Sequence, residues 1–70
     1  MMTTTTYTVT GMTCDHCVAA VTAELSSLPG VHQVRVELSS GSVTVDSDNL
    51  LSVDAVREAV DEAGYTLSHA

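Results

Sequence analysis

Cys14 and Cys17 are the only two cysteines of this 70-residue chain, and together they form a Cys-x-x-Cys pair. This spacing lets both sulfurs point at one metal ion, and it also suits a redox pair that forms and breaks a disulfide. Taken by itself the pair is a weak signal, because zinc ribbons, redox proteins and chance all produce it. Its place is more informative, since it lies between a Thr-rich segment ending at Gly11 and a segment with helical periodicity.

The two cysteines are expected at the start of a helix. Residues 11–17 are predicted to form a loop, with Cys17 at or just inside the helix N-terminus and Cys14 just before it. Unpaired backbone N–H groups and the positive end of the helix dipole favour anionic sulfur at such a place. Helix N-termini lower the pKa of a thiol from about 8.5 toward or below neutrality. We therefore predict two exposed, readily deprotonated ligands.

The number and softness of these ligands favour Cu(I). A structural Zn(II) site needs four tetrahedral ligands, and the chain has no second cysteine pair. Cu(I) is soft, favours thiolates and is satisfied by two or three of them. A two-ligand site facing solvent can hold the ion and still pass it to an incoming thiolate, because the ion is never free.

The elements around the pair are predicted in the order β-α-β-β-α-β. Apolar residues recur at helical spacing in two segments, which are Val18, Val21, Leu25 and Leu28, and then Val53, Val56, Val60 and Ala63. Alternation predicts strands over residues 3–9, 33–38, 43–45 and 65–68, with a polar connection over residues 46–51. Ser52 is the predicted N-cap of the second helix and Gly64 its C-terminal stop. Two right-handed β-α-β halves give an α+β, ferredoxin-like sandwich, with a four-stranded antiparallel sheet, both helices on one face, and one domain over residues 1–70.

Charge and composition limit the classes of molecule that the chain is expected to bind. Nine acidic residues stand against Arg35 and Arg57, with no lysine, and the formal net charge is −7. Such a surface disfavours nucleic acid and anionic membrane, and it favours a partner with a basic patch. The second predicted helix carries an acidic face, formed by Asp54, Glu58, Asp61 and Glu62. The short chain has few residues with which to line a catalytic pocket, so we do not expect an enzyme.

The sequence contains no recognisable signal peptide, because no basic segment is followed by a continuous apolar one. No stretch approaches the roughly 20 apolar residues of a membrane span. We therefore expect a cytoplasmic protein whose thiols stay reduced.

Residues 11–17 read Gly-Met-Thr-Cys-Asp-His-Cys and resemble the Gly-Met-x-Cys-x-x-Cys signature of the heavy-metal-associated domain family. The Leu-Pro-Gly-Val turn at residues 28–31, the Val34/Val36 strand and the Ala-Gly-Tyr of residues 63–65 resemble the same family. The resemblance implies the fold derived above and Cu(I) bound by Cys14 and Cys17. It further implies a copper chaperone that passes the ion to a copper-transporting P-type ATPase, or to a copper-responsive repressor, through thiolate-bridged intermediates.

Three neighbours of the cysteines receive roles by the same resemblance or by their chemistry. Met12 is expected to pack beneath the loop and not to ligate the ion. Tyr65 matches a position where bacterial copper chaperones often carry Tyr, and it is either a core aromatic or a group whose hydroxyl approaches the thiolates. His16 is interpreted as a solvated residue, with tuning of the thiols or service as a third ligand as the alternative.

Other functions stay open at this point. The chain could be the N-terminal metal-binding domain of a P-type ATPase, or a Zn(II) or Cd(II) module in which Asp15 adds a carboxylate. A thiol-disulfide oxidoreductase would need a larger thioredoxin-like chain and a proline near the cysteines, whereas the only proline, Pro29, follows the first helix. Two copies could also share one copper through four thiolates, which would give a copper-bridged homodimer.

Overall fold

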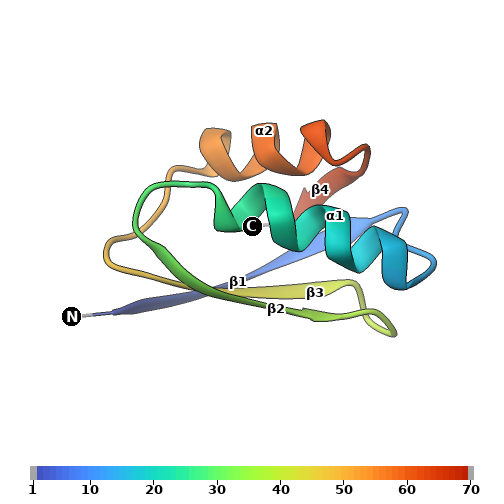
Figure 1. Cartoon of the computed structure of the whole chain (residues 1–70), viewed down its shortest axis with the longest axis horizontal. Helices are drawn as coiled ribbons and strands as arrows, with labels where there is room; N and C mark the ends of the chain where they lie inside the picture. Colours follow the sequence, from blue (N-terminus) through green and yellow to red (C-terminus); the bar gives the residue numbers. More distant parts are fainter. Residues whose placement is uncertain (1, 70) are drawn as a thin grey trace.

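The computed structural model of the chain describes residues 2–69. Its elements follow the predicted order, with bounds β1 Thr3–Thr10, α1 Asp15–Ser26, β2 Val31–Glu37, β3 Ser42–Ser47, α2 Val53–Glu62 and β4 Thr66–His69. The strands form one antiparallel sheet in the order β2-β3-β1-β4. Both helices cover the same face of this sheet (Figure 1). The α+β, ferredoxin-like sandwich is therefore confirmed.

The core fills the space between the sheet and the two helices. Side chains alternate across a strand, so Tyr7 and Val9 of β1 are buried, while Thr6 and Thr10 on either side of them are exposed on the outer face. The buried hydrophobic residues are Tyr7, Val9, Cys17, Val21, Leu25, Val43, Val45, Val56, Ala59, Val60 and Leu67. Each fully buried Val or Leu contributes roughly 1.5–3 kcal/mol of transfer free energy, so this aliphatic layer is what fastens the helices to the sheet.

The second helix begins and ends as predicted. The Ser52 Oγ accepts a hydrogen bond from the backbone N–H of Ala55 at 3.1 Å, so Ser52 is the N-cap. At the other end Gly64 has φ +93° and donates to the carbonyl of Asp61, while the N–H of Tyr65 donates to the carbonyl of Val60 at 3.1 Å. This pair of bonds is a Schellman motif, and it fixes the direction in which the chain leaves α2.

Several predicted boundaries are wrong. The helix α1 begins at Asp15, so only residues 11–14 precede it as loop. Leu38 follows the end of β2, and Tyr65 precedes β4. Residues 46 and 47 were predicted in a polar connection, yet they end β3 and are buried. They are tolerated there because Asp46 accepts a hydrogen bond from the Thr4 hydroxyl at 2.8 Å and the Ser47 hydroxyl donates to the Asn49 carbonyl at 2.6 Å.

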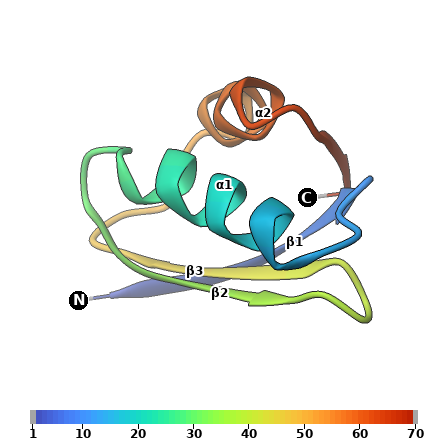
Figure 2. The ribbon, with the colours of Figure 1, turned by 45° about the vertical axis from the view of Figure 1, so that its right-hand side comes forward.

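Turning the molecule by 45° shows the segment between β1 and α1 at the end opposite the start of β1 (Figure 2). The chain leaves β1 at Thr10 and enters α1 at Asp15, so this segment joins an inner strand of the sheet to the first helix. Within residues 2–69 no helix is long and apolar enough to cross a membrane.

Candidate metal site

The two cysteine sulfurs lie 3.5 Å apart in the cysteine segment, which comprises residues 11–17. Gly11 turns the chain out of β1 with φ +95°, a conformation that L side chains rarely adopt. Cys14 is the extended N-cap residue of α1, with φ −157°, and Cys17 is the third residue of the helix. Both thiols are free, and their separation is far beyond the roughly 2.05 Å of a disulfide. Two sulfurs this close can reach the same ion.

The cysteines differ in exposure. Cys14 is exposed, whereas Cys17 retains only 6% of its surface. The expectation of two exposed thiols is therefore wrong for Cys17. The reason is helical spacing, because Cys17 begins the buried stripe that continues with Val21 and Leu25, each four residues further along α1. The site thus combines one solvent-facing sulfur with one sulfur anchored in the core.

The surroundings of Cys17 favour its thiolate. The pKa of Cys17 falls from 9.0 to about 6, chiefly because the backbone N–H of Thr13 donates to its sulfur across 3.5 Å. The Tyr65 hydroxyl lowers the pKa further as a hydrogen-bond donor, burial opposes both effects, and Cys14 adds smaller lowering contributions. The Thr13 hydroxyl also lies 3.9 Å from the same sulfur. A thiolate at neutral pH is the form that binds metal.

Tyr65 reaches this segment from the other helix. The Schellman motif at the end of α2 sets its backbone, and its half-buried ring packs against the core. A Cβ placed on Gly11 would lie 3.3 Å from the ring carbon Cδ1, so the ring covers the glycine closely. The interaction with Cys17 raises the pKa of Tyr65, which keeps its hydroxyl protonated and able to donate. Tyr65 therefore combines the two roles considered for it: its ring packs against the core, and its hydroxyl donates to the sulfur of Cys17.

The other predicted neighbours of the cysteines differ in burial. Met12 is half-buried and packs against the hydrophobic core. His16 and Asp15 are exposed in the first turn of α1. Across the part of the chain that the structure describes, no third His, Cys, Asp or Glu joins the cysteines in a group that could hold a metal ion. The structure thus brings two cysteine sulfurs together as candidate metal donors.

Sequence reasoning missed two residues that shape the site. Thr13 has no predicted role, although its backbone N–H is the largest influence on the pKa of Cys17. Gly11 is predicted to end the first strand and matches the family signature, but its lack of a side chain also makes room for the Tyr65 ring. The signal for Thr13 was its position four residues before Cys17, but a backbone donor leaves no mark in residue type. Only the folded loop identifies it.

Known proteins share much of the sequence and the fold of this chain. The copper chaperone CopZ of Staphylococcus haemolyticus is 45% identical over 58 residues, which is 81% of this chain and 85% of that protein. A solved CopZ metallochaperone is 32% identical, superposes with a TM-score of 0.86, and matches over 93% of this chain and 98% of its own. A copper-binding domain from HMA7, a P-type ATPase, is 31% identical with a TM-score of 0.85, over 100% of this chain and 95% of its own. The profile of the heavy-metal-associated domain matches residues 6–66, and the chain belongs to that family.

Proposed function

We propose that this chain is a copper metallochaperone, which carries one Cu(I) ion between the thiolates of Cys14 and Cys17. The observation that carries the proposal is the pair of sulfurs 3.5 Å apart, with the pKa of Cys17 lowered to about 6. Two soft anionic ligands suit Cu(I), whereas Zn(II) would lack half of its tetrahedral set. The relatives named as copper chaperones support the same assignment.

The unequal exposure of the cysteines supports an order of transfer. A thiolate of the acceptor approaches from the side of exposed Cys14 and forms a Cu–S bond, which gives a three-coordinate ion. The Cys14–Cu bond then breaks, and Cys14 leaves with its electron pair as a thiolate. A second acceptor thiolate replaces buried Cys17 in the same way. Copper stays Cu(I) throughout, so the exchange needs no oxidant or reductant.

The acceptor that we propose is a metal-binding domain of a copper-transporting P-type ATPase. A copper-binding domain of a P-type ATPase has nearly the same fold as this chain, which supports a transfer between two domains of similar shape. The same likeness favours a second candidate, in which this chain is itself an ATPase module. A copper-responsive repressor and a copper-bridged homodimer would use the same exposed sulfur. Each of these roles requires reduced thiols, which a cytoplasmic setting provides.

A competition titration tests the proposal. The fully reduced protein is offered Cu(I) and Zn(II) separately against a calibrated chelator under anaerobic conditions, and native mass spectrometry counts the bound ions. We expect one Cu(I) per chain, held far more tightly than Zn(II). A variant in which both cysteines are replaced by serine is the control and should bind neither ion tightly. Zn(II) held as tightly as Cu(I), or no tight Cu(I), would overturn the proposal.

A further inference from the structure

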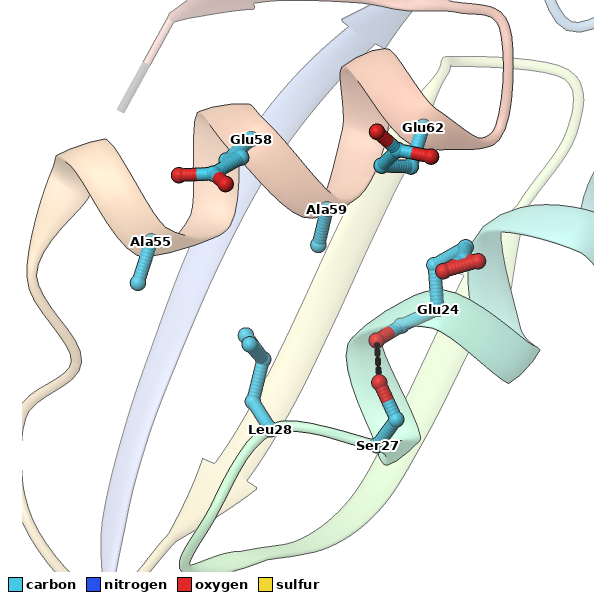
Figure 3. Close-up of a pocket in the computed structure, with 7 residues that line it drawn as sticks. All are labelled: Glu24, Ser27, Leu28, Ala55, Glu58, Ala59 and Glu62. Carbon is cyan, nitrogen blue, oxygen red and sulfur yellow. Dashed lines mark hydrogen bonds between the residues drawn. The ribbon is translucent and has the colours of Figure 1, made fainter.

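A groove of about 270 Å³ runs between the two helices, away from the cysteine segment. It is lined by Glu24, Ser27 and Leu28 at the end of α1, and by Ala55, Glu58, Ala59 and Glu62 of α2. In Figure 3 Leu28 points from the α1 side toward α2, and the two alanines point back toward α1. The groove exists because α2 presents alanines at this face, at positions four residues apart, where larger side chains would close the gap. We call it the interhelical groove.

The interhelical groove has an apolar floor and an acidic rim. Leu28, Ala55 and Ala59 supply the floor, and Ala59 is 7% exposed. The carboxylates belong to Glu24, Glu58 and Glu62, and none of these takes part in an ion pair among the described residues.

Among the described residues, no basic side chain forms an ion pair with this rim. The two arginines of the chain are engaged elsewhere, since Arg57 pairs with Asp54 at 3.3 Å and Arg35 with Asp46 at 3.5 Å. There is no lysine. The rim therefore keeps an uncompensated negative charge beside an apolar surface.

The chemistry of the groove selects one kind of occupant. The three carboxylates do not form a metal site, because no set of His, Cys, Asp or Glu within residues 2–69 is arranged to hold an ion. A second copy of the chain would bring another net charge of −7 and no lysine, so like charges would oppose it. A Lys or Arg side chain fits both features, because its aliphatic stem lies on apolar surface while its charged head meets the carboxylates.

We propose that the interhelical groove is a docking site for a basic segment of a partner protein, which inserts a Lys or Arg side chain over Leu28, Ala55 and Ala59. The site lies on the helical layer and does not involve the cysteine thiols. It binds its partner with or without copper. Its failure would thus leave the metal-carrying function untouched, and the reverse also holds.

The test uses the reduced, metal-free protein and a synthetic helical peptide of Lys and Leu residues, followed by nuclear magnetic resonance titration. We expect the largest shift changes at the residues of the groove, and weaker binding as salt screens the charges. The same peptide with every Lys replaced by Gln should bind at least about tenfold more weakly.

Two pairs of variants separate the groove from bulk charge. The double variant Glu58→Gln/Glu62→Gln should weaken peptide binding about tenfold, while Glu37→Gln/Asp61→Asn removes the same charge outside the groove and should change it less than about threefold. Ala55→Leu fills the groove without altering charge and should also weaken peptide binding, whereas Ala23→Leu on the exposed surface of α1 should leave it unchanged. Equal losses in both double variants, or shifts confined to the outer face of the sheet, would overturn the proposal.

Discussion

The N-termini of the two helices differ in how their N-cap side chains are used. Each helix start leaves backbone N–H groups without partners inside the helix. At α2 the Ser52 hydroxyl accepts one of them, from Ala55, at 3.1 Å. At α1 the N-cap is Cys14, and its side chain makes no capping hydrogen bond. The N-terminus of α2 is therefore capped by a side chain, whereas the side chain of Cys14 at the N-terminus of α1 makes no capping bond and can bind a metal ion.

The difference shows what the proposed metal site gives up for its chemistry. A hydroxyl or carboxylate cap stabilises a helix by about 1 kcal/mol, and α1 forgoes this contribution. In exchange, two thiols sit where the helix dipole and the N–H of Thr13 favour negative charge. The predictions below convert one kind of terminus into the other, or remove one contribution at a time.

The largest expected effect follows from replacing a cysteine. Cys14→Ser turns the start of α1 into a terminus of the α2 type, and it removes one of the two proposed copper ligands. Cu(I) affinity should fall more than about a hundredfold, beyond the tenfold to hundredfold cost of losing an outer-shell partner. Competition with a Cu(I) chelator measures this.

Stability is the control for this variant, because serine is a preferred N-cap residue. The free energy of unfolding of metal-free Cys14→Ser should equal or exceed that of the parent protein. A variant that loses copper because it has unfolded would not test the ligand, and urea unfolding distinguishes the two cases.

The next largest effect is the pH dependence of stability in the reduced, metal-free protein. The folded pKa of Cys17, about 6, lies below its ordinary value of 9.0, so the folded state favours the thiolate. This contribution is fully present above pH 9 and is lost as the pH falls toward 6. The free energy of unfolding should rise from pH 6 to pH 9, and the rise should be absent in Cys17→Ser. Parallel urea titrations of the two proteins that showed the same slope would contradict the assignment.

Removing the N-cap of α2 should have a smaller effect, which falls on stability and not on metal binding. Ser52→Ala removes the hydroxyl that accepts from Ala55, so stability should fall by about 1 kcal/mol. The Cu(I) affinity should not change, because Ser52 caps α2, whereas both sulfurs lie at the start of α1. Thermal unfolding and chelator competition on one preparation measure both quantities. A matching loss of copper affinity would show that the two termini are coupled.

Removing the Tyr65 hydroxyl tests how much this group contributes to the lowered pKa of Cys17. In Tyr65→Phe the pKa of Cys17 should rise, because a hydrogen-bond donor to the sulfur is lost. It should stay below 9.0, because the N–H of Thr13 is the larger cause and remains in place. The ultraviolet absorbance of the thiolate, followed against pH, reports the change. Cys14→Ser carrying the same substitution isolates the signal of Cys17.

Much of this arrangement could be predicted from the sequence, and the failures share a cause. Helical and alternating periodicities predicted the order of all six elements, and Ser52 was recognised because capping depends on residue type. The burial of Cys17 was missed although Val21 and Leu25 continue its stripe, because the prediction placed the cysteine at the boundary of loop and helix and began the apolar stripe at Val18. Buried Asp46 was missed because its partner Thr4 is 42 residues away in the chain. Backbone donors and long-range polar partners are not visible in local patterns.

His16 provides the smallest expected effect and the sharpest limit on the donor set. Its side chain is exposed in the first turn of α1, and it does not join the cysteines in any group able to hold a metal among the described residues. His16→Ala should therefore change Cu(I) affinity less than about tenfold, which is below the usual cost of removing even an outer-shell partner. A larger loss, measured against the same chelator at the same pH, would mean that the imidazole moves onto the ion when copper binds. The site would then have three donors, and transfer would have to break one more bond.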